Sequence, residues 1–251
     1  YTVLRCYTET PEALPDETGR TDKRQVVLPQ VLLDSLCRIN PDIPTDTVHA
    51  IAEELCHTPV SGDLMLTNFG NYQKIRNGIA VEYTKNGHKT SDILRLIDFS
   101  KPENNSFIVA SQMWIKGEIH WRRPDLLLFV NGLPLVFIEL KNSNIPVKNA
   151  YDINLQNYLK DIPYLFDYNQ ICDLSNGTET RLGSFGAGYE FFFEWLKVHS
   201  EKENPDRKAI RENCVSLEYF INGLCEPATL LDYIETVSYT HLRAHETDQY
   251  L

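Results

Sequence analysis

Two short apolar segments joined by an Asn-Gly dipeptide constrain the fold of this chain more than any other feature. Residues 126–130 and 135–140 are runs of apolar, β-favouring residues, and Asn131 and Gly132 between them tolerate the positive backbone angles of a tight turn. This pattern predicts an antiparallel hairpin. Because both strands are apolar almost without interruption, we expect the sheet that contains them to be covered on both faces.

Charged residues stand at the open end of the predicted hairpin. Asp125 precedes the first strand, while Glu139 and Lys141 end the second strand, two residues apart and therefore on one face. A strict two-residue turn pairs Asp125 with Ile138 and sends the carboxylates to opposite faces. A three-residue loop over 131–133 pairs Asp125 with Glu139, with their Cβ atoms about 5 Å apart. We expect the second register, with the extra loop residue absorbed as a bulge, since both carboxylates then meet one cation.

The residue types at this end suit the hydrolysis of a phosphodiester. Two carboxylates so close repel each other unless a cation lies between them, and oxygen ligands with room for water suit Mg²⁺. An ammonium group beside them, that of Lys141, is placed to hold an attacking water or to stabilise charge that develops on a phosphate. The bare pattern also fits a hairpin that ends in solvated charges, so the surrounding sequence has to decide.

The surrounding sequence favours the chemical interpretation. Pro-Asp, thirteen residues and Glu-x-Lys resemble the PD-(D/E)xK nuclease motif. The segments around it read Arg-Arg-Pro-Asp-Leu, Phe-Val-Asn-Gly-Leu-Pro-Leu-Val and Ile-Glu-Leu-Lys-Asn. Together they resemble the N-terminal nuclease domain of the restriction (R) subunit of type I restriction enzymes. Further similar segments lie at 96–99, 102–107, 162–169, 175–177 and 186–190, so we expect the resemblance to cover about residues 20–235.

The resemblance implies a fold and a set of site residues. The fold would be α/β, a restriction-endonuclease-like central mixed β-sheet flanked by helices. Asp125 and Glu139 would ligate Mg²⁺, with the Leu140 carbonyl as a further ligand. Lys141 would position or activate the water, which makes Asp125, Glu139 and Lys141 the catalytic residues.

Accessory positions follow from the same resemblance. Many members carry Gln-x-x-x-Tyr on the helix after the hairpin, and the positions that align here are Asn154 and Tyr158, with an amide one methylene shorter. Independently of the resemblance, their positive charge beside the motif makes Arg122 and Arg123 candidate contacts to DNA phosphates. Nucleases of this fold often use a helical glutamate as well, but the adjacent pair at 53–54 is typical of a solvated helix face and is left out of the site.

Partners are implied in the same way. The resemblance predicts double-stranded DNA and the modification (M) and specificity (S) subunits as partners, with ATP consumed by helicase-like domains further along the native chain. No Gly-x-x-x-x-Gly-Lys-Ser/Thr phosphate loop occurs in this sequence. Two alternatives stay open: a stand-alone or modification-dependent nuclease of the same fold, and a docking module without catalysis.

The composition and net charge of this chain limit how it can bind DNA. Its 251 residues, 42% of them hydrophobic, suit one globular domain, and no apolar run or leader predicts a membrane segment or secretion, so we expect a cytoplasmic protein. The formal net charge of −11 argues against binding DNA with the whole surface, because duplex affinity comes largely from neutralised phosphates. Other domains are therefore expected to hold the DNA.

The remaining pattern predicts the elements around the hairpin and the domain bounds. We expect helices at 26–38, 45–57, 72–79, 150–161, 191–199, 216–224 and 226–236, and a charged surface loop at 200–211. Strands at 80–84, 92–99 and 107–115 would join the hairpin in a central sheet of four or five strands. The nuclease domain is assigned to 1–236, with its native start upstream and motor domains downstream. Residues 237–251 resemble a translated sequencing adapter and are excluded from the fold.

Overall fold

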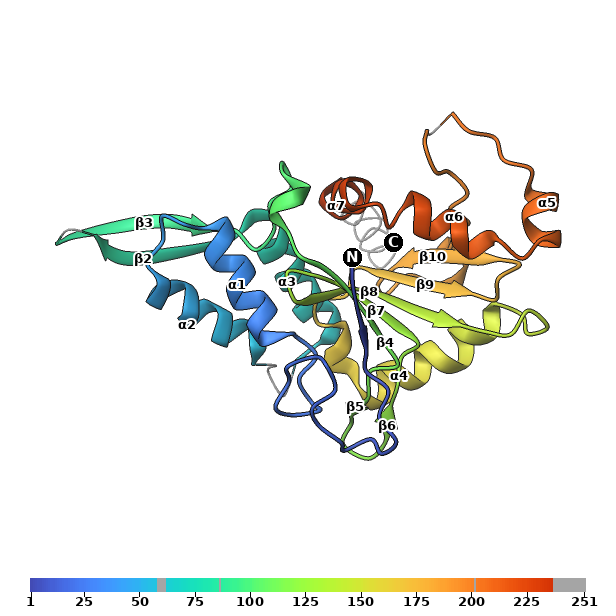
Figure 1. The fold of residues 1–251 in the computed structure, drawn as a ribbon, viewed down its shortest axis with the longest axis horizontal. Coiled ribbons are helices and arrows are strands. Elements are labelled where there is room, and N and C mark those ends of the chain that lie inside the picture. Colours follow the sequence, from blue (N-terminus) through green and yellow to red (C-terminus); the bar gives the residue numbers. More distant parts are fainter. Residues whose placement is uncertain (58–61, 86, 201, 237–251) are drawn as a thin grey trace, which may run out of the picture.

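A six-stranded mixed sheet forms the centre of the chain. The structure is a computed structural model and describes residues 1–57, 62–85, 87–200 and 202–236 (Figure 1). The sheet order is β1-β4-β7-β8-β9-β10, with parallel pairing of β1 to β4 and of β8 to β9 and antiparallel pairing elsewhere. Its strands are β1 (Thr2–Arg5), β4 (Phe107–Ser111), β7 (Leu126–Val130), β8 (Leu133–Leu140), β9 (Ile171–Ser175) and β10 (Thr180–Ser184).

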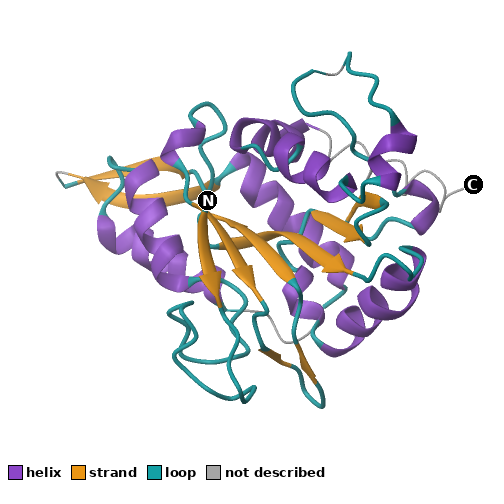
Figure 2. Cartoon of the chain, turned by 45° about the vertical axis from the view of Figure 1, so that its right-hand side comes forward, coloured by secondary structure: helices purple, strands orange, loops and turns teal. Residues whose placement is uncertain are grey.

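Helices lie on both sides of this sheet (Figure 2), which confirms the expected fold class. The helical segments are α1 (Pro29–Ile39), α2 (Thr45–Cys56), α3 (Leu64–Asn77), η1 (Pro102–Asn104), the π-helical η2 (Ala150–Leu155), α4 (Gln156–Asp161), η3 (Pro163–Phe166), η4 (Tyr189–Phe191), α5 (Arg207–Glu212), α6 (Ser216–Gly223) and α7 (Pro227–Thr236). On one face, the Phe137 ring of β8 packs against Tyr158 and Phe166, at 5.2 and 5.5 Å between ring centroids. In the described part of the chain, no helix combines the length and the apolarity that a membrane span requires.

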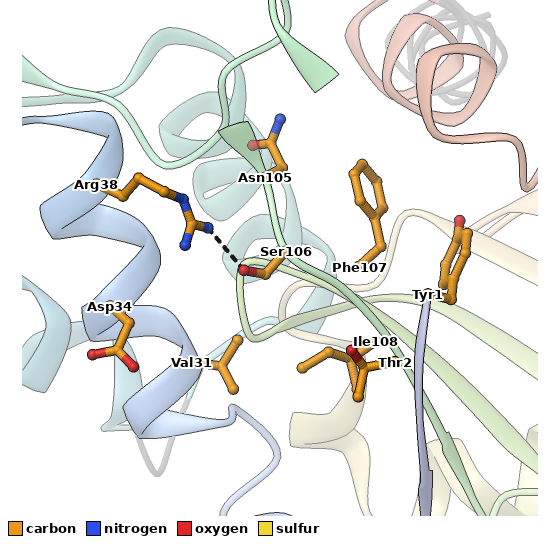
Figure 3. A pocket seen from close by; sticks show the side chains of 9 residues that line it. All are labelled: Tyr1, Thr2, Val31, Asp34, Arg38, Asn105, Ser106, Phe107 and Ile108. Atoms are coloured by element: carbon orange, nitrogen blue, oxygen red, sulfur yellow. Dashed lines mark hydrogen bonds between the residues drawn. The ribbon is translucent and has the colours of Figure 1, made fainter. Parts of the chain in front are cut away.

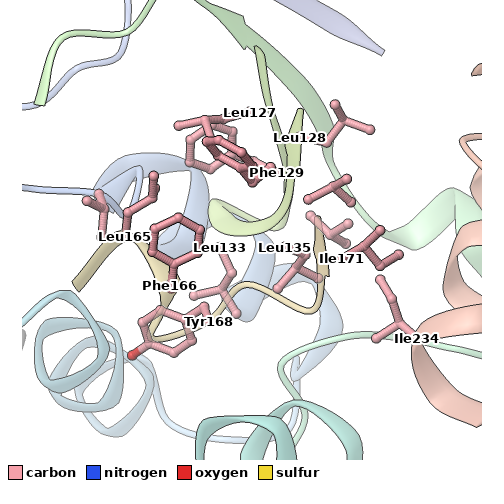
Figure 4. Packing of buried hydrophobic residues seen from close by; sticks show 14 of the residues in the cluster. Leu127, Leu128, Phe129, Leu133, Leu135, Leu165, Phe166, Tyr168, Ile171 and Ile234 are labelled. Carbon is pink, nitrogen blue, oxygen red and sulfur yellow. The ribbon is translucent and has the colours of Figure 1, made fainter. Parts of the chain in front are cut away.

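The two central strands are deeply buried. Every apolar side chain at 127–130 and 135–138 is 3% exposed or less. Figure 4 shows Leu127, Leu128, Phe129 and Leu135 in a cluster with residues of η3, β9 and α7. Burying one large aliphatic or aromatic side chain stabilises a fold by about 1.5–3 kcal/mol. The continuous apolar runs thus correctly predicted a sheet covered on both faces.

The turn between these strands has two residues, so the expected three-residue loop is wrong. Val130 pairs with Leu133, and Asn131 and Gly132 take φ angles of 52° and 83°. Asn131 is completely buried. Its Nδ2 donates to the carbonyl of Leu96 and to Oδ1 of Asn105, at 2.9 and 2.8 Å. A turn that would ordinarily face water is therefore fixed inside the protein.

The one-residue shift that the longer loop was expected to supply occurs inside β8 instead. Leu128 pairs with Val136 and Phe129 pairs with Pro134, so Leu135 is the extra residue of a β-bulge. Beyond the bulge, Leu126 pairs with Ile138. Continuing that register by one residue places Asp125 opposite Glu139. The expected register is therefore confirmed, and its source is the bulge at Leu135 rather than a longer loop.

Other parts of the sheet differ from the expectation of four or five strands. β2 (Ile79–Lys85) and β3 (His88–Leu94) pair only with each other, in an arm that projects from the body (Figure 1). Within these two strands only Val81 and Leu94 are buried, which is too little apolar surface to join the central sheet. β1, β9 and β10 take their places and were not predicted.

The expected helix at 191–199 is also wrong. Phe193 and Leu182 exchange two backbone hydrogen bonds, at 2.9 and 3.0 Å, so this segment runs extended along β10. The aromatic residues there have helical spacing but supply the edge of a sheet instead. Within the segment expected to be a loop at 200–211, α5 begins at Arg207. The predicted tail at 237–251 lies outside the described residues.

Asp173 of β9 is a buried carboxyl group in the middle of a strand. It is 0% exposed, and neither carboxyl oxygen has a hydrogen-bond partner among the described residues. Burial raises its pKa well above the ordinary value. The folded chain therefore holds a proton on Asp173 at pH values where the unfolded chain has released it. That difference must lower stability as pH rises from about 4 toward the folded-state pKa.

We expect Asp173→Asn to remove this pH dependence. The amide does not ionise, so the melting temperature of the variant relative to wild type should rise steadily between pH 4 and pH 8, as followed by circular dichroism. Asp232→Asn, on the exposed side of α7, is the matched control and should show no such trend. A difference between Asp173→Asn and wild type that is constant over this pH range would contradict the assignment.

Candidate functional site

The three residues predicted to be catalytic meet at one end of the β7–β8 pair. Asp125 stands directly before β7, Glu139 lies near the end of β8, and Lys141 follows it. The Lys141 Nζ donates to Glu139 Oε1 at 2.6 Å and lies 3.3 Å from the Leu140 carbonyl oxygen. A backbone hydrogen bond of 2.7 Å from Lys141 to Ser175 fixes the chain at this point.

Glu139 is more buried than its place at a strand end suggested. The residue is 3% exposed, and its Oε2 atom has no hydrogen-bond partner among the described residues. Burial raises the pKa of Glu139, and the nearby charge of Asp125 raises it further, while the hydrogen bond from Lys141 and the nearby hydroxyl of Tyr158 act in the opposite direction. A buried carboxylate oxygen without a partner is unfavourable unless a cation or proton satisfies it.

Asp125 is held from both neighbouring strands. Its Oδ2 accepts a hydrogen bond from the Leu140 N–H at 2.8 Å, and its Oδ1 accepts one from Gln112 Nε2 at 2.8 Å. Gln112 follows β4 and was not predicted as part of the site. No signal within the motif could have found it, because it comes close to Asp125 only through the pairing of β4 with β7.

Of the two accessory residues, Tyr158 reaches the site. It is buried on α4, and its hydroxyl donates to the Arg123 carbonyl at 3.1 Å. Burial raises its pKa, and the nearby charges of Glu139 and Asp125 raise it further. Asn154 lies one turn earlier, half-buried in η2, and its role stays a prediction.

The two arginines proposed as phosphate contacts are engaged within the protein. Arg122 Nε donates to Asp161 Oδ2 at 2.6 Å. The Arg123 guanidinium lies over the rings of Trp114 and Tyr7, at 4.8 and 5.4 Å from their centroids. The charge of Arg122 is thus largely neutralised before any DNA arrives. Any contact to phosphate by Arg122 has to compete with Asp161.

The glutamates left out of the site are exposed, as expected. The side chains of Glu53 and Glu54 on α2 are 70% and 64% exposed and lie near His49 and Lys74. The pocket in Figure 3, of about 520 Å³, lies between α1 and the start of β4. The register of β4 with β7 puts that pocket at the turn end of the sheet, opposite the end that carries Asp125.

The residues at this end fit a hard divalent cation. Two carboxylates, Asp125 and Glu139, share one face, and the Leu140 carbonyl directly follows Glu139 in the chain. Among the described residues no group of three His, Cys, Asp or Glu side chains is gathered. Mg²⁺ often binds through only one or two carboxylates and keeps several waters. The Oε2 atom of Glu139 is the oxygen that would coordinate such an ion.

Comparison with known proteins decides the family. Residues 1–191 match the family described as "Type I restriction enzyme R protein N terminus". This chain belongs to that family. The match starts earlier and ends earlier than the expected span of about 20–235. It contains all six strands of the sheet and all three residues Asp125, Glu139 and Lys141, and it ends before α5.

Relatives within the type I restriction enzyme family are similar over most of this chain. The "Type I restriction enzyme HindI endonuclease subunit" of Haemophilus influenzae is 36% identical over 222 residues, 86% of this chain and 20% of the relative. A protein of Methanocaldococcus jannaschii is 28% identical over 244 residues, 91% of this chain and 23% of its own length. The "Type I restriction enzyme SauCOLORF180P endonuclease subunit" of Staphylococcus aureus is 31% identical over 163 residues, 63% of this chain and 16% of the relative. The chain therefore spans about a fifth of the length of the first two relatives.

Proposed function

We propose that this chain is the nuclease domain of a type I restriction enzyme R subunit and that it hydrolyses phosphodiester bonds of double-stranded DNA with Mg²⁺. The observation that carries the proposal is the burial of the Glu139 carboxylate beside Asp125 and Lys141, with an Oε2 atom that makes no hydrogen bond of normal geometry to the described residues. A hairpin that merely ends in solvated charges would not bury one of them. The names of the relatives as endonuclease subunits support the same assignment.

Each residue has a distinct part in this proposal. Asp125 and Glu139 would hold the metal, with the Leu140 carbonyl as a further ligand. A bound Mg²⁺ would polarise the phosphate and favour ionisation of a bound water. Lys141, anchored on Glu139, can turn its remaining N–H groups toward a water or a phosphate oxygen. Tyr158 fixes the Arg123 backbone next to Asp125.

The proposal includes partners that this chain does not contain. Modification and specificity subunits would recognise the DNA, and domains elsewhere in the R subunit would hydrolyse ATP, with the cytoplasm as the place of action. The net charge of −11 supports this division, because an acidic domain needs other surfaces to hold a duplex. The presence of all three residues of the motif argues against the alternative of a docking module without catalysis.

Stabilisation by Mg²⁺ tests the metal site without DNA. An ion that binds only the folded chain stabilises it by about 1.4 kcal/mol when its free concentration is ten times Kd. We therefore expect Mg²⁺ to raise the melting temperature of wild type and to leave that of Glu139→Gln unchanged. Glu54→Gln, an exposed control, should respond as wild type does. Equal stabilisation of wild type and Glu139→Gln by Mg²⁺ would place the ion elsewhere and refute the site.

A further inference from the structure

Gln112 lies opposite Asp125 on the side away from Glu139. The backbone N–H of Gln112 donates to the Asp125 carbonyl at 3.0 Å, and its Nε2 donates to Asp125 Oδ1 at 2.8 Å. This contact continues the pairing of Ser111 with Leu126 by one residue. Gln112, Asp125 and Glu139 therefore form a row across three neighbouring strands.

The backbone of Gln112 has an unusual conformation. Its φ angle is 55°, in the left-handed region that residues with a β-carbon rarely adopt. A glycine would adopt this angle without strain. Such strain persists where the surroundings impose it, and it gathers at functional sites. Here the strained residue is the one whose side chain reaches the Asp125 carboxylate.

We propose that Gln112 is a positioning residue that holds the Asp125 carboxylate in the orientation a divalent cation needs. This inference rests on the proposed function. The Leu140 N–H fixes Oδ2 and the Gln112 amide fixes Oδ1, so donors from the two flanking strands define the plane of the carboxylate. Groups that orient a ligating carboxylate in this way typically change metal affinity by about 10–100-fold.

The neutral charge of the Gln112 amide suits this task. A lysine or arginine at this position would form an ion pair with Asp125 and compete with a cation, whereas an amide donates a hydrogen bond and adds no charge. The cationic donor of the site, Lys141, contacts Oε1 of Glu139 instead, and no described residue donates a hydrogen bond of normal geometry to Oε2. The side chain that orients Asp125 therefore places no positive charge beside it.

Binding of Mn²⁺ to the chain without DNA, followed by the electron paramagnetic resonance signal of the free ion, tests the inference. Gln112→Ala and Gln112→Gly should both weaken Mn²⁺ binding by about 10–100-fold. Gln112→Gly should melt at a higher temperature than Gln112→Ala, because glycine relieves the positive φ. A merely structural role would make affinity follow stability, so equal losses of affinity at unequal stability are the expected signature.

A matched control is available on α1. Gln30 Nε2 donates to Asp34 Oδ1 at 2.8 Å, which is the same contact on an exposed helix face. Gln30→Ala should bind Mn²⁺ as wild type does. A loss of affinity in Gln30→Ala equal to that in Gln112→Ala would show a general effect of removing such a bond and would overturn the positioning role.

Asp125→Asn separates failure of this inference from failure of the proposed function. Suppose that wild type binds Mn²⁺ and Asp125→Asn does not, while both Gln112 variants bind normally. The positioning role is then overturned and the proposed function stands. If wild type binds no Mn²⁺, or if Asp125→Asn binds it as well as wild type, both proposals fall. Affinity that tracks melting temperature across the two Gln112 variants also overturns the positioning role.

Discussion

Lys141→Ala in the assembled enzyme is expected to abolish DNA cleavage and to leave DNA-dependent ATP hydrolysis near normal. Removal of a single group that stabilises transition-state charge lowers catalytic rates by about 100–1,000-fold. In the described part of the chain, the Lys141 ammonium contacts Glu139 and the Leu140 carbonyl, both of which belong to this site. ATP chemistry needs a phosphate-binding loop, and this sequence has none of the Gly-x-x-x-x-Gly-Lys-Ser/Thr type.

Plasmid cleavage and phosphate release, measured on the same preparations, check this prediction. Lys148→Ala is the matched control, because Lys148 is 56% exposed and pairs with Asp152 on the helix surface. Combining Lys141→Ala with Asp125→Ala should add little further loss, since removing one member already disables the unit. Cleavage by Lys141→Ala at the normal rate would remove it from the mechanism. A parallel fall in ATP hydrolysis would indicate damaged assembly instead.

Gly132→Ala is expected to destabilise the fold by about 3 kcal/mol, combining left-handed backbone strain with overpacking. An added β-carbon would lie 2.7 Å from the Leu28 carbonyl oxygen and 2.8 Å from the Leu32 nitrogen, and φ is +83°. The contacting atoms belong to the backbone at the start of α1, so they cannot move aside as a flexible side chain would. Such a loss is a large part of the total stability of a domain, about 5–15 kcal/mol.

Urea unfolding of two glycine variants separates the clash from the backbone strain. Gly87, at the tip of the β2–β3 arm, has a φ of +81°, and an added β-carbon would meet no atom within 4 Å. Gly87→Ala therefore carries the strain alone and should cost about 1–2 kcal/mol at most. Equal losses in the two variants would mean that α1 yields to the added carbon and that its contact with the turn is loose.

The hairpin was predictable because its signals are local. The apolar runs, the Asn-Gly turn and the period-two spacing of Glu139 and Lys141 all lie within about twenty residues of sequence. The register was predicted correctly for a chemical reason, the need to bring two carboxylates together. The bulge at Leu135 that produces it was not predictable, because it depends on how β7 and β8 pack between the layers of helices.

Features that depend on distant parts of the chain were missed. Gln112 joins the site through strand pairing thirteen residues upstream of Asp125, and nothing in the motif points to it. β9 carries a buried Asp173 in its middle, and this ionisable residue interrupts the apolar pattern by which a buried strand is predicted. The burial of Glu139 was missed as well, since it results from α4 and Tyr158 covering that face of the sheet.

The buried Asn131-Gly132 turn also determines how this protein ages chemically. In a flexible Asn-Gly sequence, the glycine backbone nitrogen attacks the asparagine side-chain carbonyl and expels ammonia, and water then opens the resulting cyclic imide to a carboxylate. The folded chain blocks this attack, because the Asn131 amide is held at three points, by Leu96, Asn105 and the Ser106 N–H. Deamidation at this position therefore requires the core to open first. A carboxylate at this position would be buried without a compensating charge, so a deamidated molecule could not close again in the native way. Each deamidation event therefore makes a transient opening irreversible. The deamidated fraction consequently increases with the frequency at which the hairpin opens.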